Sequence, residues 1–188
     1  MARWEPNAGE RLERAALDLF VQQGYERTTV AEIAERAGLG KSTFFRHFTD
    51  KREVLFGGDV LGRLLAEAVA AAPAGTGPLE AVAAALDAAA TYGFRPERRQ
   101  AVRDRQQVIA AHPELTEREL LKRAGLVAAL TDALRARDVP APTAALAAEL
   151  ASLALRTALA EWTATDDTDF SALARRALAT LHAAAADL

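Results

Sequence analysis

The stretch that decides the fold lies near the N-terminus, where residues 24–53 read GYERTTVAEIAERAGLGKSTFFRHFTDKRE. Thr29 and Glu32 have the spacing of a capping box, which predicts that a short helix begins at this point. Gly38 is a typical stop for that helix, and a second short helix is predicted over 41–48. Two short helices joined by a glycine-containing turn predict a helix-turn-helix, whose second helix enters the major groove of DNA.

The composition predicts an all-α globular protein. The 188 residues are 51% hydrophobic and 26% charged, and Ala and Leu, which favour helices, supply most of the apolar content. The absence of cysteine excludes disulfides and cysteine-ligated zinc. With three scattered histidines we expect no metal site, and we expect no other cofactor. Since no apolar run approaches the roughly 18 residues of a membrane span, we expect a cytoplasmic protein without a membrane partner.

Apolar periodicity predicts nine helices in two domains. A three-helix DNA-binding domain is expected over 1–56 and a larger helical domain over 57–188, and Pro73–Pro78 is the clearest loop between helices. The helix from 50 to about 72 is expected to link the two domains. The predicted helices cover 8–23, 29–37, 41–48, 50–72, 78–92, 96–111, 114–138, 142–164 and 168–186.

The net charge of −3 hides a basic stretch, because residues 36–52 carry five Lys or Arg and a single acid, Asp50. Such a concentration suits a surface that contacts phosphates. Phe44 and Phe48 are four residues apart and are expected to face the core. The outer face of the segment 41–48 is then expected to present side chains that can meet phosphates or base edges, namely Lys41, Ser42, Thr43, Arg46 and His47.

Two other interpretations of this segment are open to the residues. It could be the solvated face of an unrelated helical bundle, although the turn glycine, the cap and the basic residues occur together here. A catalytic triad of Ser42, His47 and Asp50 would need a nucleophile in a pocket and an oriented base. An exposed basic helix offers neither, so we do not expect an enzyme.

The same residues resemble the signature of the tetracycline-repressor (TetR) family over about residues 8–56. The resemblance implies that Lys41, Ser42, Thr43 and Arg46 read bases and that Thr29, Phe45, His47 and Lys51 hold the phosphate backbone; Thr28 is included with them. Phe45 stands where the family usually has Tyr, so a hydroxyl contact to phosphate is absent. Gly40 stands where a Ser often caps the recognition helix, which weakens that cap.

The resemblance also implies that the second domain binds a small molecule and pairs with a second copy through its last two helices. Helix 142–164 supports the pairing independently, because it is apolar on more than one side and must be buried on more than one side. The expected dimer residues are Leu146, Leu150, Leu153, Thr157, Phe170, Leu173, Leu178 and Leu181. The expected pocket residues are Tyr92, Phe94, Arg99, Arg103, Val108, Leu126, Leu130, Leu159 and Trp162.

The sequence therefore predicts a dimeric, sequence-specific DNA-binding regulator, in which a ligand relieves repression by shifting the linking helix. An arginine-rich run over 95–105 is explained more simply as a solvated face paired with acids, and the alternative is a pocket mouth that holds an anionic head group. The stretch Arg103–Arg137 is loosely similar to second domains that respond to acyl-CoA-like ligands. The alternative is a helix-turn-helix protein without an effector, controlled by its abundance or by a protein partner.

Overall fold

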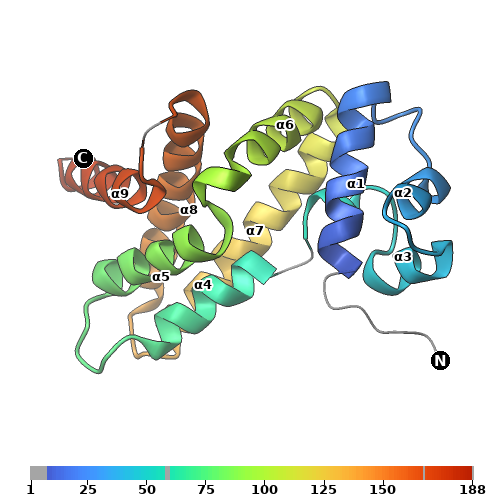
Figure 1. The fold of residues 1–188 in the computed structure, drawn as a ribbon. Coiled ribbons are helices and arrows are strands. Elements are labelled where there is room, and N and C mark those ends of the chain that lie inside the picture. Colours follow the sequence, from blue (N-terminus) through green and yellow to red (C-terminus); the bar gives the residue numbers. More distant parts are fainter. Residues whose placement is uncertain (1–7, 58–59, 167, 188) are drawn as a thin grey trace. The chain divides into compact units, whose positions relative to one another are not determined.

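The computed structural model describes residues 8–57, 60–166 and 168–187, and within these ranges the chain is helical and has no strand (Figure 1). The α-helices are α1 (Ala8–Gln23), α2 (Val30–Arg36), α3 (Lys41–His47), α4 (Val60–Ala71), α5 (Pro78–Gly93), α6 (Arg99–Ala110), α7 (Pro113–Arg135), α8 (Ala141–Ala164) and α9 (Phe170–Ala186). Two short 3-10 helices, η1 (Glu53–Leu55) and η2 (Pro96–Arg98), lie between them. The all-α class and the nine predicted helices are confirmed for the described residues.

One predicted helix is wrong, because the segment expected to be continuous from 50 to 72 is broken. The Asp50 carboxylate accepts the backbone N–H groups of Arg52 at 2.8 Å and Glu53 at 3.1 Å, which closes a tight turn before η1. Gly57 then has a φ of +59°, a left-handed conformation that a right-handed helix cannot contain. The α-helix begins only at Val60.

The chain forms two compact units, and their boundary is not a single point in the sequence. The first unit contains residues 1–58 and 103–119, and the second contains 59–102 and 120–188. The expected division after residue 56 therefore differs from the structure, because the segment 103–119 packs with the N-terminal helices. Helices α6 and α7 each contribute residues to both units.

The core of the first unit is built by the three N-terminal helices and by segment 103–119. Leu12 of α1, Ile33 of α2 and Phe44 of α3 are fully buried in it. Val108 and Leu115 belong to the same cluster, although the sequence placed Val108 in the second domain. A domain of about 50 residues buries little apolar surface by itself, so these additional side chains complete its core.

The core of the second unit lies among α4, α5, α8 and α9, with α7 contributing Leu130 and Leu134. Phe94 stacks on Phe170 with ring centroids 4.0 Å apart, and Trp162 meets Phe170 edge to face at 5.9 Å. Helix α8 is long and apolar enough by composition to cross a membrane. Its apolar side chains instead pack against α5 and α9, as expected for the central helix of a helical core.

Leu130 and Leu121, both on α7, offer a matched pair that tests this core. Leu130 is 1% exposed and Leu121 is 58% exposed. We expect Leu130→Ala to lower the free energy of unfolding by about 2–5 kcal/mol, because it removes buried methyl groups and leaves a cavity. Leu121→Ala should change it by less than about 0.5 kcal/mol. Urea denaturation measures both, and equal losses would contradict the assigned core.

Candidate nucleic-acid interface and ligand-binding residues

Helix α2 begins with the capping box that the sequence predicted. The Thr29 hydroxyl accepts the backbone N–H of Glu32 at 3.3 Å, and the Glu32 carboxylate accepts the backbone N–H of Thr29 at 2.8 Å. The hydroxyl of Thr29 also donates to the same carboxylate at 2.7 Å. These bonds satisfy backbone donors that a helix start otherwise leaves without a partner.

The turn between α2 and α3 depends on Gly38, which has a φ of +66°. Its N–H donates to the carbonyl of Glu35, and the N–H of Leu39 donates to the carbonyl of Ala34, so the helix ends in a Schellman motif. A Cβ at position 38 would lie 3.0 Å from a guanidinium nitrogen of Arg11. Glycine therefore satisfies both the backbone conformation and the close approach of α1.

Helix α3 has one buried and one exposed face. Phe44 is fully buried and Phe48, directly after the helix, is 8% exposed, as the spacing predicted. The opposite face is open to solvent, and Phe45 on it is 50% exposed. The side chains of Lys41, Ser42, Arg46 and His47 are also exposed, and Thr43 is half-buried.

The exposed face of α3 carries positive charge that is not neutralised nearby. Neither Lys41 nor Arg46 has an acidic partner among the described residues. Arg46 reaches the hydroxyl of Thr43 at 3.5 Å, and the Lys41 ammonium lies 5.9 Å from the centre of the Phe45 ring. These contacts leave most of the donors of both cations available to an anionic partner.

Two predicted DNA-contacting residues are engaged inside the first unit. Thr28 is 1% exposed and its hydroxyl donates to the carbonyl of Gly24 at 2.8 Å, so its expected contact with DNA is not available to the side chain. Lys51 donates to the carbonyl of Tyr25 at 2.8 Å and lies 4.0 Å from the centre of the Tyr25 ring. Lys51 thus anchors the segment after α3 and keeps only part of its donor capacity.

Asp50 is tied to its neighbours rather than to catalysis. Burial raises the pKa of its carboxyl, but the hydrogen bonds from the Arg52 side chain and the backbone of Glu53 hold the pKa below its usual value. Arg52 forms an ion pair with this carboxylate at 2.9 Å. The charges of Arg52 and Asp50 therefore neutralise each other, and neither adds net charge to the surface near α3.

A second set of contacts, which the sequence did not predict, holds η1 against segment 103–119 within the first unit. Arg118 forms an ion pair with Glu53 at 2.5 Å. Arg105 donates to the carbonyl of Leu55 at 2.5 Å, and its guanidinium lies 5.3 Å from the centre of the Phe56 ring. The partners are more than 45 residues apart in sequence, so no local pattern could have revealed them.

Arg99 is the most unusual of the predicted ligand residues. It is 7% exposed, and its guanidinium lies 4.7 Å from the centre of the Trp162 ring. One terminal nitrogen donates to the carbonyl of Thr168 at 2.8 Å, but its Nε has no hydrogen-bond partner. Among the described residues Arg99 has no acidic partner, so a buried charge is left with one hydrogen bond and an aromatic face.

The other predicted pocket residues divide between the two units and differ in their exposure. Leu130 and Trp162 are fully buried in the second core, Phe94, Leu126 and Leu159 are half-buried against it, and Tyr92 is 50% exposed. Val108 and Arg103 belong to the first unit instead. Their helical spacing alone could not distinguish which of the two cores they join, because α6 passes from one unit to the other.

The predicted dimer residues divide into three groups. Phe170, Leu173 and Leu178 are at most 5% exposed and are buried within the second core of this chain, so their side chains are not available to a second copy. Leu146 is 54% exposed, and Thr157 is also exposed. Of the remaining three, Leu150 is 8% exposed and Leu153 and Leu181 are half-buried.

Comparison with known proteins shows a likeness that is concentrated in the N-terminal helices. Residues 13–56 match the model of the bacterial regulatory proteins of the tetR family. The regulator TcmR of Streptomyces glaucescens is 44% identical over 80 residues, which are 42% of this chain and 35% of TcmR. The regulator YvkB of Bacillus subtilis is 44% identical over 43 residues, 23% of each chain. The chain thus spans about a third or less of the length of these relatives.

Solved structures extend the likeness of the fold to nearly the whole chain. SmeT in complex with triclosan has a TM-score of 0.63 at 20% identity and covers 95% of this chain and 91% of its own; SmeT is the repressor of a Stenotrophomonas maltophilia efflux pump. FadR of Bacillus subtilis in complex with stearoyl-CoA has a TM-score of 0.61 at 17% identity. The match covers 92% of this chain and 96% of the FadR chain. At these identities the likeness shows the shared all-helical fold.

The capping box of α2 can be tested by Thr29→Ala. We expect this change to lower the free energy of unfolding by about 1 kcal/mol near neutral pH, and Thr29→Ser to retain most of the stability. The pH dependence gives a second test of the same cap, because hydrogen bonds from Thr29 hold the pKa of Glu32 below its usual value. The stabilisation by this carboxylate is therefore present above the ordinary pKa of glutamate and is lost as the pH falls through the lowered value. Urea denaturation at neutral and acid pH should show the Thr29→Ala deficit shrinking in acid, and an undiminished deficit would contradict the role of Glu32.

Proposed function

The N-terminal domain of this chain belongs to the tetR family of bacterial regulatory proteins, and from that premise we propose that the whole chain is a sequence-specific DNA-binding transcriptional regulator. The observation that carries the proposal is the exposed face of α3, where neither Lys41 nor Arg46 has an acidic partner within residues 8–57, 60–166 and 168–187. The fully buried Phe44 fixes the orientation of that face. A protein of this class has no catalytic role, and we place it in the cytoplasm.

The side chains of this face suit the two tasks of a DNA interface, base reading and phosphate binding. Lys41 and Arg46 can donate to the O6 and N7 acceptors of guanine, and Ser42 can meet a base edge. The exposed His47 can donate to the phosphate backbone, which supplies much of the affinity but no sequence information. Thr29 is also exposed, but its hydroxyl and its backbone N–H already donate to the Glu32 carboxylate. Phe45 offers only its ring at the position where a hydroxyl would reach a phosphate.

The regulator acts as a homodimer in this proposal, because a short recognition helix gains specificity by pairing on a two-fold operator, with centres about 34–36 Å apart. The exposed Leu146 and Thr157 of α8, together with Leu153, support a contact with a second copy. The buried Phe170, Leu173 and Leu178 hold α8 and α9 together within each copy. They support the dimer only indirectly, by fixing the helices that carry its surface.

The effector proposed for the second unit is an amphipathic anion. A buried guanidinium without an acidic partner is costly, and an anionic ligand group would supply the missing acceptor for Arg99. The aromatic cluster of Phe94, Trp162 and Phe170 lies directly beside it. The complexes of SmeT with triclosan and of FadR with stearoyl-CoA support ligand binding on this fold.

The route from ligand to DNA runs through α6 and α7 rather than through a continuous helix over 50–72. Both helices contribute residues to both units, so a displacement of either one in the second unit acts on segment 103–119. That segment is fixed to η1 by the Arg118–Glu53 and Arg105–Leu55 contacts. A ligand that prefers one arrangement of these helices would shift the population of DNA-binding dimers and relieve repression.

A second candidate function is a regulator without an effector, controlled by its abundance or by a protein partner. Leu130 and Trp162 favour it, because both were predicted to line a pocket and both are fully buried in the core. The two candidates differ in whether any small molecule changes the affinity for DNA.

Arg46→Ala tests the DNA interface. On a site obtained by selection from random DNA, we expect the affinity to fall by about 1–3 kcal/mol, roughly 5- to 150-fold, with the loss concentrated at one base position. Arg135→Ala removes the same charge from the exposed end of α7 and should leave the affinity unchanged. Fluorescence anisotropy measures both, and two chains per duplex are expected. An equal effect of the two substitutions would contradict base reading by α3.

Phe45→Tyr tests the same interface by a gain. The added hydroxyl on a half-exposed ring should donate to a phosphate and raise the affinity for DNA by about 0.5–1.5 kcal/mol, roughly 2- to 12-fold. Because a phosphate contact carries no base information, the increase should be similar on selected and random DNA. An unchanged or lower affinity would mean that Phe45 does not lie against the backbone.

Arg99→Gln tests the effector. With stearoyl-CoA as the probe, we expect the affinity of the unaltered protein for the selected DNA to fall at saturation. The concentration needed for half of this effect should rise at least about tenfold in Arg99→Gln, since a charge-assisted hydrogen bond is lost. Arg98→Gln, an exposed neighbour, is the control. No response of the unaltered protein to the probe would contradict the acyl-CoA-like class, and an equal response of Arg99→Gln would contradict the role of Arg99.

A further inference from the structure

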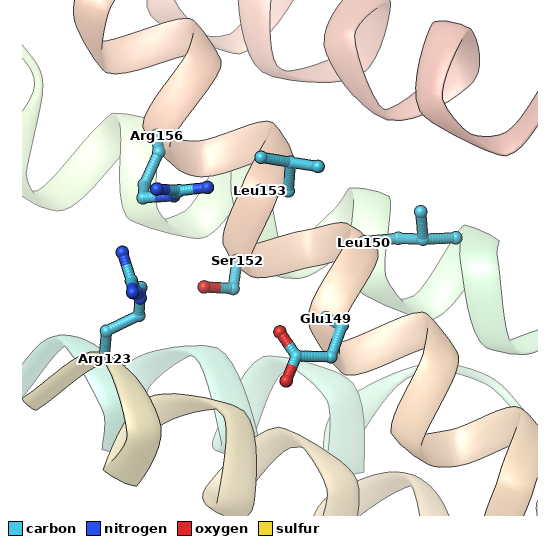
Figure 2. Close-up of a pocket in the computed structure, with 6 residues that line it drawn as sticks. All are labelled: Arg123, Glu149, Leu150, Ser152, Leu153 and Arg156. Atoms are coloured by element: carbon cyan, nitrogen blue, oxygen red, sulfur yellow. The ribbon is translucent and has the colours of Figure 1, made fainter. Parts of the chain in front are cut away.

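A small pocket lies between α7 and α8 within the second unit, apart from Arg99 and its aromatic cluster (Figure 2). Its volume is about 210 Å³, below the roughly 300–1,000 Å³ of pockets that hold drug-sized ligands. An acyl chain or a coenzyme would not fit. The pocket is lined by Arg123 of α7 and by Glu149, Leu150, Ser152, Leu153 and Arg156 of α8.

Two arginines converge on this pocket from different helices. Figure 2 shows Arg123 reaching from α7 towards α8, and the Arg156 guanidinium lying on the same side of α8 above it. Within the part of the chain that the structure describes, neither guanidinium has an ion-pair or hydrogen-bond partner. Two free guanidinium groups around one space are the usual arrangement for holding a carboxylate or phosphate.

Ser152 adds a hydroxyl that has no hydrogen-bond partner among the described residues. It is 4% exposed, and Figure 2 shows its oxygen pointing into the space between the arginines and Glu149. The hydroxyl groups of Thr131 on α7 and Thr163 on α8 donate to the carbonyl four residues earlier, at 2.8 and 2.9 Å. Ser152 makes no such bond among the described residues, although a helical serine readily can. Its hydroxyl is therefore available to a ligand.

The ionisable lining residues define the charge of that ligand. Glu149 is the one acid of the pocket, so the three ionisable side chains leave a single excess positive charge. A monoanion neutralises this charge, whereas a dianion exceeds it and meets repulsion from Glu149. Figure 2 shows the side chains of Leu150 and Leu153 on the other side of α8, so the charged groups and the hydroxyl of Ser152 define the ligand.

We propose that this pocket binds a small organic monocarboxylate. Arg123 and Arg156 donate to the carboxylate oxygens, and Ser152 donates its hydroxyl to one of them. The site is separate from the Arg99 site and does not depend on DNA binding, so its test succeeds or fails independently of the proposed function.

Benzoate is a suitable probe because it combines one carboxylate with a compact apolar group. In calorimetric titration of the full chain, in a buffer free of other carboxylates and of phosphate, we expect saturable binding of one benzoate per chain. Arg123→Gln and Arg156→Gln should each weaken it at least about tenfold, because a hydrogen bond to a charged group is lost. Arg135→Gln, which removes a charge from the same helix outside the pocket, should bind benzoate as the unaltered protein does.

Glu149→Gln provides a test that misfolding cannot imitate, because the expected result is a gain. The unaltered protein should bind inorganic phosphate at least about tenfold more weakly than benzoate, and Glu149→Gln should narrow that difference by tightening phosphate binding. The absence of saturable benzoate binding would overturn the proposal. It would also be overturned by an equal loss of benzoate binding in Arg135→Gln and Arg123→Gln, since the effect would then be one of general surface charge.

Discussion

The burial of Phe44 is the constraint on which the DNA-binding face depends. Helix α3 has seven residues, too few to be stable in water without tertiary contacts. Phe44 is fully buried beside Ile33 and Phe20, and this contact holds the helix in place. Because each residue of a helix is rotated by about 100° from the one before it, placing Phe44 inward places Phe45 and Arg46 towards solvent. The Gly38 turn sets where this helix begins.

The same core needs side chains from far along the chain. Val108, Ile109 and Leu115 are buried with the N-terminal helices, and Tyr25 packs against His112 with ring centroids 5.0 Å apart. Burial and a hydrogen bond to Glu114 raise the pKa of Tyr25, so this ring stays neutral in the physiological range. The first unit is therefore completed by helices that also belong to the second. The stability of the face that we propose to bind DNA therefore depends on these contacts.

Much of the fold follows from local sequence signals. The capping box at Thr29, the stop at Gly38 and the spacing of Phe44 and Phe48 each act within a few residues, and the structure contains each of them. The break at Gly57 was missed because Asp50 and Glu53 have the spacing of a helix start, while the conformation of Gly57 depends on its surroundings. Thr28 was predicted to contact DNA, but its hydroxyl donates to a backbone carbonyl inside the first unit, and the sequence does not show this contact.

The larger errors concern contacts between distant residues. Helical periodicity shows that Val108 and Phe170 are buried, but not whether the burial occurs in the first core, in the second core or against another copy. Arg99 was among the expected pocket residues, but a sequence does not show which polar groups lack a partner. The unpartnered Nε of Arg99 and the hydroxyl of Ser152 could therefore be recognised only from the structure. The arginines of the α7–α8 pocket lie 33 residues apart in sequence and come together only in the folded chain.

The central claim is that the chain binds DNA in a sequence-selective manner through a charged face. The most direct measurement is a titration of the purified protein against its own upstream DNA and against random DNA at two salt concentrations. We expect binding to the upstream DNA to be at least about 10³-fold tighter than to random DNA, and to weaken steeply as salt rises, because bound cations are released from the phosphates. Equal affinity for both DNAs, with little dependence on salt, would contradict the claim.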